Sequence, residues 1–527
     1  MSEKYEKLHR FHGRIREKSR KSVLNMLFGR SALIILMLAV QIILMLGLFM
    51  RWQYASFAYG GSYVLGLFMA LHLINKPMNT SARQTWLIVI LLAPIFGTAL
   101  YAFVDMDIGH RLVRRELEQI EKRTRNILPA PRISRENIVR EEPSAAGLAK
   151  YLYDHGGFPI YANTHVAYYP TGEESINALL DELEHAQKFI FIEFFIIDEG
   201  MVWDSVLEIL KRKVAEGVEV RVMYDGTDAV FRLPYKYPEK LRAMGIQCKM
   251  FSPLRPLVST HYNNRDHRKI VVIDGQVAFT GGVNLADEYV NATHPHGYWK
   301  DNAILLKGEA VRSFTLMFLR MWNVFERGAE YASYLNAPLA SVSDASGYVI
   351  PYGDSPFDDE RVGETVYLDI INRAERYVHI MTPYLIIDAE MTQALTTASK
   401  RGVDVRLILP HIPDKKTAFA LAHTHYRELL AAGVRIYEFV PGFVHAKTFV
   451  SDDKKAVVGT INLDYRSLYL HFECAAYMLN MPTIARIEED YQHTLKDCEQ
   501  ITIESLKKDR WPRRLLGYLL KVFAPLM

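Results

Sequence analysis

Cysteine is scarce in this chain of 527 residues, which contains only Cys248, Cys474 and Cys498. No two of them stand at a CxxC spacing or at another spacing typical of metal ligands. The sequence therefore gives no case for a disulfide framework or a cysteine-ligated zinc site. We expect three ordinary thiols, and neither a metal nor any other cofactor.

Positive and negative charges nearly balance, since the formal net charge is only +3. Nothing supplies the basic, aromatic-studded groove that binds single-stranded nucleic acid, so no nucleic-acid partner is expected. The basic residues are instead clustered. Residues 1–30 contain nine Lys or Arg against three acids, and a C-terminal cluster comprises Arg510, Arg513, Arg514 and Lys521. Basic clusters beside hydrophobic segments are typical of proteins that bind anionic membrane surfaces.

Three stretches lack Asp, Glu, Lys and Arg altogether, namely residues 31–50, 52–75 and 84–104. Each has about 20 residues, the length that a helix needs to cross the hydrocarbon core of a bilayer. They predict a membrane domain of three transmembrane helices behind a basic tail, residues 1–30. The first stretch is too long for a signal peptide and lacks an evident cleavage site, so we interpret it as a retained anchor.

The membrane face that carries the remaining residues stays open. The basic tail favours a cytoplasmic N-terminus, from which three full crossings would put the later residues outside. The basic residues between positions 111 and 125 favour the opposite orientation. Pro94 and Gly97 could also let the third stretch kink or re-enter the membrane.

The chain beyond the membrane domain repeats itself. Residues 105–150 are charged and contain prolines, which predicts a helix followed by a linker. Residues 186–198 then resemble residues 374–388, and residues 215–225 resemble residues 399–410. Alternating apolar and helical runs of this kind suggest βαβ units, so we predict an α/β fold of two related halves with mixed, largely parallel sheets. The predicted halves are residues 151–340 and 341–505, followed by an amphipathic tail, residues 506–527.

Each half contains one copy of the motif His-x-Lys-x4-Asp-x6-Gly-x2-Asn. The first copy comprises His267, Lys269, Asp274, Gly281 and Asn284; the second comprises His445, Lys447, Asp452, Gly459 and Asn462. A histidine and a lysine two residues apart on a strand point to the same face. The Asp-Gly pair at position 274 predicts a hairpin turn, which returns the glycine and the asparagine towards the histidine.

These residue types suit transfer at a phosphodiester. Two lysines and two asparagine amides supply fixed positive charge and hydrogen-bond donors without a metal. One imidazole can attack phosphorus while the other protonates the departing alcohol and then deprotonates the acceptor. Two histidines are thus needed in one site, and the duplication provides them.

From about residue 68 to residue 527 the chain resembles the bacterial cardiolipin synthases of the phospholipase D superfamily. The resemblance covers residues 75–104, the stretch HRKIVVIDGQVAFTGGVNLADEY, the stretch YWKD, the stretch GFVHAKTFVSDDKKAVVGTINLDYRS and the terminal FAPLM. It implies a phospholipase D-like fold and a multi-pass protein of the bacterial cell membrane. His471 departs from the family, which commonly has asparagine at this position.

The resemblance also implies a role for each site residue. His267 would be the nucleophile that forms a phosphatidyl-histidine, and His445 would be the general acid and then the base. The phosphate would be held by Lys269, Lys447, Asn284 and Asn462. A carboxylate downstream of each motif would orient its histidine, Asp301 for the first copy and Glu473 for the second. Asp274 and Asp452 belong to the catalytic motif but look structural.

The reaction that the resemblance implies is phosphatidyl transfer between two phosphatidylglycerol molecules, giving cardiolipin and glycerol. Phosphatidylglycerol and other anionic phospholipids, together with the membrane, are the expected partners. A phospholipase D-type hydrolase, a transferase for another alcohol and a non-catalytic scaffold remain alternatives. The sequence does not determine the oligomeric state.

The C-terminal tail predicts an amphipathic helix. Leucines 515, 516, 519 and 520 share one face with Phe523, while the basic residues occupy the rest. A helix lying on anionic lipid and a helix docked on the protein both fit this pattern.

Overall fold

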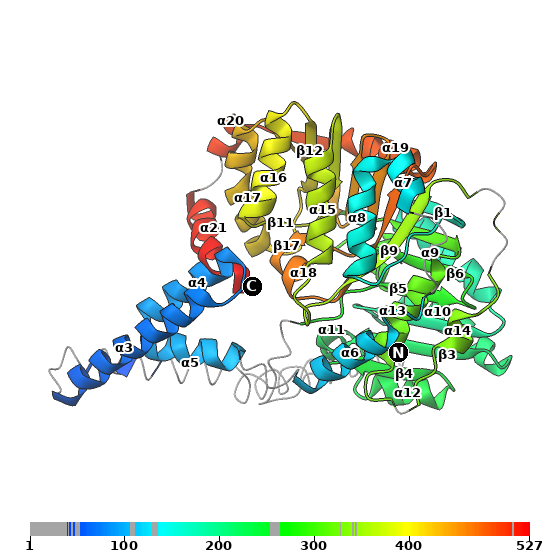
Figure 1. Ribbon diagram of the computed structural model, residues 1–527, viewed down its shortest axis with the longest axis horizontal. Helices are drawn as coiled ribbons and strands as arrows, with labels where there is room; N and C mark the ends of the chain where they lie inside the picture. Colours follow the sequence, from blue (N-terminus) through cyan, green and yellow to red (C-terminus); the bar gives the residue numbers. More distant parts are fainter. Residues whose placement is uncertain are drawn as a thin grey trace, which may run out of the picture. The chain divides into compact units, whose positions relative to one another are not determined.

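The computed structural model describes residues 53–105, 111–128, 135–252, 264–326, 328–339, 345–508 and 511–526, together with single positions at 39, 42, 43, 46, 47 and 342. The predicted basic tail and most of the first uncharged stretch lie outside the described residues. The chain forms two compact units, one of residues 1–112 and one of residues 113–253 and 263–525. Figure 1 shows the helices and strands of both.

The first unit contains three described helices, α3 (Gln53–Asn75), α4 (Thr80–Leu92) and α5 (Pro94–Asp105). Two helices cover the predicted segment 84–104, because α4 ends before Pro94 and α5 begins there. Proline lacks the N–H of a continuous helix and clashes with the preceding turn. At Gly97 a Cβ atom would lie 2.6 Å from the carbonyl oxygen of Val89, so the glycine lets α5 fold back closely on α4. The kink that Pro94 and Gly97 predicted is therefore present.

No helix within the described ranges combines the length and the apolar character needed to cross a membrane. Helix α3 nevertheless exposes large apolar side chains. Phe68 is 66% exposed and Leu67 is 59% exposed.

The second unit begins with helices and then forms a seven-stranded sheet. Where the sequence predicted a linker, the chain forms α7 and α8. The helices are α6 (Arg111–Thr124), α7 (Arg135–Glu141), α8 (Pro143–Asp154), α9 (Gly172–Glu184), α10 (Met201–Ala215), α11 (Gly226–Arg232), α12 (Tyr237–Ala243), η1 (Asp287–Val290), α13 (Val311–Trp322) and α14 (Ala332–Leu335). The strands are β1 (Thr164–Tyr169), β2 (Phe189–Phe194), β3 (Glu219–Asp225), β4 (Gln247–Phe251), β5 (Ile270–Ile273), β6 (Val277–Gly281), β7 (Tyr298–Lys300) and β8 (Ala303–Gly308). The order in the sheet is β1-β8-β6-β5-β2-β3-β4.

The later residues form an eight-stranded sheet of order β19-β13-β12-β10-β15-β16-β18-β9. The strands are β9 (Tyr348–Asp354), β10 (Tyr377–Met381), β11 (Leu385–Ile386), β12 (Asp404–Pro410), β13 (Arg435–Phe439), β14 (Gly442–Val444), β15 (Thr448–Ser451), β16 (Lys455–Gly459), β17 (Leu463–Asp464), β18 (Glu473–Leu479) and β19 (Cys498–Ile501). The helices are α15 (Val362–Arg373), α16 (Ala389–Lys400), α17 (Lys416–Ala431), α18 (Tyr465–Tyr469), α19 (Thr483–Leu495), α20 (Ile503–Lys507), α21 (Trp511–Phe523) and η2 (Ala524–Leu526). Helices α15, α16 and α17 lie side by side along the second sheet (Figure 1).

The prediction of largely parallel sheets is wrong, although the α/β class and the mixed character are confirmed. In the first sheet only β2–β3 and β3–β4 pair in parallel, and in the second only β10–β12 and β12–β13 do so, among the described strands. Each βαβ unit supplies these parallel pairs. The hairpins that carry the motifs, β5–β6 and β15–β16, then extend each sheet with antiparallel strands.

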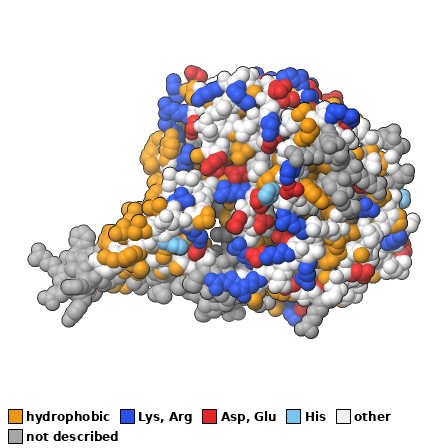
Figure 2. All heavy atoms as spheres, in the orientation of Figure 1, with side chains coloured by type: hydrophobic (Ala, Val, Ile, Leu, Met, Phe, Trp, Pro, Cys, Tyr) orange, Lys and Arg blue, Asp and Glu red, His pale blue; other side chains and the backbone are white. Residues whose placement is uncertain are grey.

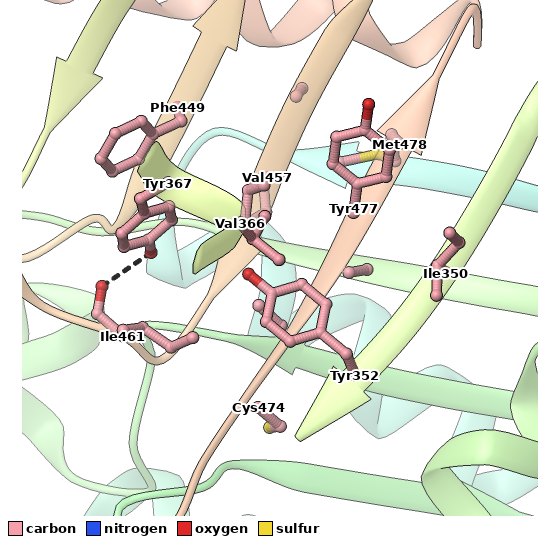
Figure 3. Close-up of a cluster of buried hydrophobic side chains, with 14 of the residues drawn as sticks. Ile350, Tyr352, Val366, Tyr367, Phe449, Val457, Ile461, Cys474, Tyr477 and Met478 are labelled. Atoms are coloured by element: carbon pink, nitrogen blue, oxygen red, sulfur yellow. Dashed lines mark hydrogen bonds between the residues drawn. The ribbon is translucent and has the colours of Figure 1, made fainter. Parts of the chain in front are cut away.

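The two sheets share one hydrophobic core. Helix α13 contacts β5, β6 and β8 of the first sheet and β9 of the second, while α19 contacts β1 as well as strands of the second sheet. Figure 3 shows part of this core around Tyr352, Tyr367 and Tyr477. The Tyr367 hydroxyl donates a hydrogen bond of 2.9 Å to the carbonyl oxygen of Ile461. Residue 461 precedes Asn462, so the core directly holds the end of the second motif.

Candidate active site

The two His-x-Lys pairs lie in extended segments just before the hairpins, rather than within the strands. His267 and Lys269 precede β5, and His445 and Lys447 precede β15. All four side chains are buried, with exposed fractions of at most 7%. The Lys269 ammonium donates a hydrogen bond of 2.7 Å to the carbonyl oxygen of His267, and Lys447 donates to that of His445 in the same way. Each motif therefore folds its lysine back beside its own histidine.

The hairpin prediction is confirmed. Strands β5 and β6 pair antiparallel, and Asp274 and Gly275 at their turn have φ angles of 54° and 67°. The Asp274 carboxylate accepts hydrogen bonds from the backbone N–H groups of residues 187–189, at 2.7 to 2.8 Å. Asp452 accepts in the same way from residues 375–377, at 2.8 to 2.9 Å. Both aspartates thus tie a motif hairpin to the start of the neighbouring strand, and neither contacts a motif histidine.

The histidines are paired with carboxylates from the opposite half, which corrects the sequence prediction. Nδ1 of His267 lies 2.9 and 3.0 Å from the two carboxylate oxygens of Glu473. Nδ1 of His445 lies 2.6 Å from Oδ2 of Asp301. The sequence had assigned Asp301 to the first motif and Glu473 to the second. Each half therefore orients the histidine of the other.

Backbone pairing between the halves explains the exchange. Strand β14 pairs in parallel with β7, and the N–H of His445 donates to the carbonyl oxygen of Lys300 at 2.7 Å, directly before Asp301. On the other side the N–H of His267 donates to the carbonyl oxygen of Phe472 at 2.9 Å, directly before Glu473. The same relation occurs twice, so the two motifs form one site with approximate twofold symmetry.

The symmetry fails at the residue that follows each motif glycine. At Gly282 a Cβ atom would lie 1.9 Å from Oδ1 of Asp301, so only glycine admits this carboxylate. The second motif has Thr460 at that position, and its hydroxyl donates to Glu473. The carboxylate serving His445 thus packs against Gly282 and accepts from the N–H of Asn302 at 2.9 Å, whereas the one serving His267 accepts from a side-chain hydroxyl.

The two motif asparagines also differ. The Asn284 amide spans two groups, accepting from the N–H of Ile196 at 3.1 Å and donating to the Tyr289 hydroxyl at 2.7 Å. The Tyr289 ring lies edge-on to His445, with 5.3 Å between ring centroids. Asn462 is 5% exposed, and its Oδ1 atom has no hydrogen-bond partner among the described residues. Asn284 therefore holds part of the wall beside His445, while Asn462 retains an unsatisfied hydrogen-bond acceptor.

Burial and positive charge govern protonation in the site. Burial lowers the pKa of Lys269 to about 8 and that of Lys447 to about 7. Burial and the nearby Lys447 lower the pKa of His445 to about 4. Burial, Lys269, Lys447 and His445 together hold the pKa of His267 well below its usual range. Both histidines are therefore neutral near pH 7, and an anion entering the site would favour the protonated lysines and a protonated histidine.

Asp301 keeps its charge in this surrounding. Burial acts to raise its pKa, but His445, Lys447 and the backbone N–H of Asn302 together outweigh burial and leave the pKa of Asp301 below its usual range. A carboxylate can only accept hydrogen bonds, so Nδ1 of His445 must carry a proton. The same geometry at Glu473 puts the proton of neutral His267 on Nδ1, which leaves a free lone pair on its Nε2.

A third histidine, His471, lies beside the first. Its ring centroid is 5.6 Å from that of His267, and both of its ring nitrogens are buried without a hydrogen-bond partner among the described residues. Burial lowers the pKa of His471 to about 4. One ligand atom from each of His267, His471 and Glu473 lies within 4.8 Å of the others, a set that could hold a metal ion. Such an ion would occupy His267 and so compete with its use as a nucleophile.

Sequence reasoning missed the residues that position the motif groups. Thr460 stands at an unspecified position of the motif, and Tyr289 lies five residues after Asn284 without a recurring spacing to announce it. The edge of the Phe195 ring lies against His267 at 5.0 Å between ring centroids, and Phe195 comes from the loop after β2. Their contacts depend on the tertiary arrangement, which no local pattern encodes.

Comparison with known proteins agrees with this geometry. A family model described as "Cardiolipin synthase, PLD-like domain" matches residues 179–322 and 367–495. The solved structure of phosphatidylserine synthase from Haemophilus influenzae superposes with a TM-score of 0.55 at 16% identity, covering 72% of this chain and 97% of that one. Two lobes that share one site of paired histidines and lysines thus define a phospholipase D-like protein.

The curated relatives narrow this class. The chain is 32% identical to a cardiolipin synthase of Geobacillus kaustophilus over 86% of its own length and 90% of the relative. It is 32% identical to cardiolipin synthase 2 of Bacillus anthracis, over 85% and 87% of the two chains. An uncharacterized protein of Streptococcus mutans is 51% identical over 87% of this chain and 99% of that protein. The chain belongs to the cardiolipin synthase family.

Proposed function

We propose that the protein is a cardiolipin synthase that transfers a phosphatidyl group from one phosphatidylglycerol to another. The observation that carries this proposal is the crossed pair of histidine–carboxylate contacts within a site that also holds two buried lysines. The family membership supplies the class of substrate. No metal is required, because the two lysines and the NH₂ group of Asn462 provide the positive charge and the donors that a phosphodiester needs.

In the first step Nε2 of His267 attacks the phosphorus of the donor lipid. A phosphorus–nitrogen bond forms, and the bond from phosphorus to the glycerol oxygen breaks. His445 delivers the proton that this oxygen takes up, so glycerol leaves as a neutral alcohol. The result is a phosphatidyl-histidine at His267 and a neutral His445.

In the second step the free hydroxyl of another phosphatidylglycerol attacks the same phosphorus. His445 accepts the hydroxyl proton, the phosphorus–nitrogen bond breaks and cardiolipin leaves. Lys269, Lys447 and the NH₂ group of Asn462 donate to the phosphoryl oxygens in both steps, while Asp301 and Glu473 act as positioning residues. His445 returns to its protonated form and His267 to its neutral form.

The different surroundings of the histidines support this division of labour. Asp301 acts to raise the pKa of His445, whereas the leading influences on His267 all lower its pKa. A proton recruited by the bound anion therefore goes to His445. That leaves His267 as the unprotonated nucleophile.

We also propose that the protein is held at a bacterial cell membrane by the three uncharged stretches. The exposed apolar side chains of α3 and the 74% exposure of Leu92 on α4 support membrane attachment. We also propose the domain division at residues 104–105, 150–151, 340–341 and 505–506. Extraction of isolated membranes at alkaline pH tests the membrane attachment, since release of the full chain into the supernatant would contradict the attachment.

Product analysis tests the activity. Purified full-length protein is incubated in vesicles of phosphatidylglycerol, and the lipids are quantified together with released glycerol. We expect cardiolipin and glycerol in equal amounts, and no turnover in His267→Ala or His445→Ala. Release of phosphatidic acid without cardiolipin would show a hydrolase and contradict the proposal. Wild-type activity in either alanine variant would contradict the shared site.

A further inference from the structure

Helix α21 packs along α17, and the two helices approach most closely at Gly517. At Gly517 a Cβ atom would lie 2.4 Å from the carbonyl oxygen of Ala420 and 2.9 Å from Cγ2 of Thr424. The following turn, Ala524, is 3% exposed and packs in a small cluster with Leu421 and Tyr465. Figure 1 shows α21 lying beside α17. The C-terminal helix is therefore docked on the protein along α17.

Helix α21 also exposes large apolar side chains beside its basic residues. Six large side chains are between 42% and 72% exposed. They are Trp511, Leu515, Leu516, Tyr518, Leu519 and Phe523. A docked helix normally buries its apolar face, so this arrangement differs from ordinary packing. Of the two alternatives left open by the sequence, docking on the protein is confirmed, and the docked helix still exposes apolar side chains.

A cavity of about 220 Å³ opens where α17, α20 and α21 meet. Its basic lining residues are Arg427, Lys507, Arg513 and Arg514, and no Asp or Glu is among the described residues that line it. Thr424 and Tyr518 add hydroxyl groups, and Leu506 adds an apolar wall. Figure 2 shows Lys and Arg side chains over α20, next to hydrophobic side chains over α21. Basic and apolar groups thus adjoin one another at this surface.

The cavity is separate from the active site but connected to it by α17. Lys415 caps the N-terminus of α17 and lies close enough to lower the pKa of His267. Arg427 lies twelve residues further along, which is about 18 Å at 1.5 Å per residue. Tyr465, against which Ala524 packs, follows Asn462 by three residues. The end of α21 therefore packs beside the segment that directly follows the second motif.

We propose that this cavity binds the headgroup phosphate of an anionic phospholipid while the exposed face of α21 lies among the acyl chains. Guanidinium groups bind phosphate oxygens in bidentate fashion. An exposed apolar face marks a surface that binds a protein or a membrane. A phospholipid supplies a phosphate for the cavity and, next to it, acyl chains for the apolar side chains of α21. Binding of the lipid at this cavity does not depend on the proposed function. Its expected consequence does depend on it, because the bound lipid would hold the catalytic centre at a surface that contains its substrate.

Quenching of Trp511 fluorescence tests the proposal on the full-length protein in neutral detergent micelles. Brominated phosphatidic acid or brominated phosphatidylcholine is added, and the signal of the Trp511→Phe variant is subtracted. Phosphatidic acid is the probe because it has no headgroup alcohol to exchange, so turnover does not enter the measurement. We expect phosphatidic acid to quench Trp511 at a much lower mole fraction than phosphatidylcholine does.

The double variant Arg513→Gln/Arg514→Gln identifies the headgroup site. A basic residue near an anionic lipid surface contributes about fivefold to binding, so the double variant should need about 25-fold more phosphatidic acid. Lys400→Gln/Arg486→Gln is the matched control, since it removes two exposed basic residues outside the cavity and should behave as the wild type.

Three results would overturn the proposal. Equal quenching by the two lipids would exclude headgroup recognition. Full reversal by inorganic phosphate would show a site for free anions, and loss of Trp511 exposure through self-association would show an interface with a second copy. The Arg513→Gln/Arg514→Gln variant should still form cardiolipin from micelles saturated with phosphatidylglycerol, because its catalytic groups are unchanged. This measurement separates failure of the lipid site from failure of the proposed function.

Discussion

Replacing Glu473 with glutamine tests the crossed pairing of histidines and carboxylates. The Thr460 hydroxyl donates to one carboxylate oxygen, so the glutamine carbonyl should take that position and turn its NH₂ group towards Nδ1 of His267. An NH₂ group at this place favours the tautomer with hydrogen on Nε2. His267 would then lose the lone pair with which it attacks phosphorus. Asp301→Asn should have the corresponding effect on His445 alone.

The structure sets the size of the effect. The bond between His267 and Glu473 is 2.9 Å long, and Glu473 is fully buried. A hydrogen bond to a charged group contributes about 1.5–3 kcal/mol. At about 1.4 kcal/mol per factor of ten, its loss slows attack by about 10- to 150-fold. The unfavourable tautomer adds to this loss, so the lower figure is a minimum.

A phosphatidyl ester of p-nitrophenol separates the two histidines. Its leaving group needs no protonation, so the burst of p-nitrophenolate reports attack by His267 without the help of His445. We expect Glu473→Gln to slow the burst by at least tenfold, while Asp301→Asn leaves the burst near the wild-type rate and slows turnover of phosphatidylglycerol. A slow burst in Asp301→Asn with a normal burst in Glu473→Gln would refute the crossed assignment and restore the pairing within each half.

Three further outcomes are expected. First, kcat/KM should fall as the pH rises through 7 to 8, because burial lowers the pKa of Lys447 to about 7 and that of Lys269 to about 8, and only the protonated lysines attract the phosphodiester. Activity that stays constant up to pH 10 would contradict this. Second, Gly282→Ala should lower kcat about as much as Asp301→Asn, since its Cβ atom would lie 1.9 Å from the carboxylate, whereas Gly147→Ala on α8 meets no atom closer than 3.7 Å and should be silent. Equal activity of the two alanine variants would show that Asp301 can move aside without loss. Third, Zn²⁺ should inhibit the wild type at a concentration about tenfold lower than it inhibits His471→Asn, because the variant removes one ligand of the cluster formed with His267 and Glu473. The same inhibition constant in both proteins would exclude that cluster as the metal site.

The local parts of the site could be predicted from the sequence. The motif spacing and the Asp274–Gly275 turn predicted a hairpin, and the structure confirms it. The same signal argued against sheets that are largely parallel, because every such hairpin adds an antiparallel strand. The prediction of parallel sheets came from the apolar repeats, which cover only the βαβ part of each half.

The exchange of carboxylates between the halves could not be predicted in this way. It depends on the pairing of β14 with β7 and of residue 266 with Phe472, contacts that join residues 144 to 206 positions apart across the chain. Residue types and spacing within one half carry no information about this register. The break between α4 and α5 was different, since Pro94 gave a local reason for it.

Mapping the covalent intermediate tests the central claim most directly. Full-length protein is mixed with phosphatidylglycerol, quenched within the first turnover in neutral denaturant and digested, and the modified peptide is sequenced by mass spectrometry. The account predicts a phosphatidyl group on Nε2 of His267, absent from His267→Ala and still formed by a His445→Ala variant given the p-nitrophenol ester. A phosphatidyl group on His445, or turnover without any histidine adduct, would contradict it.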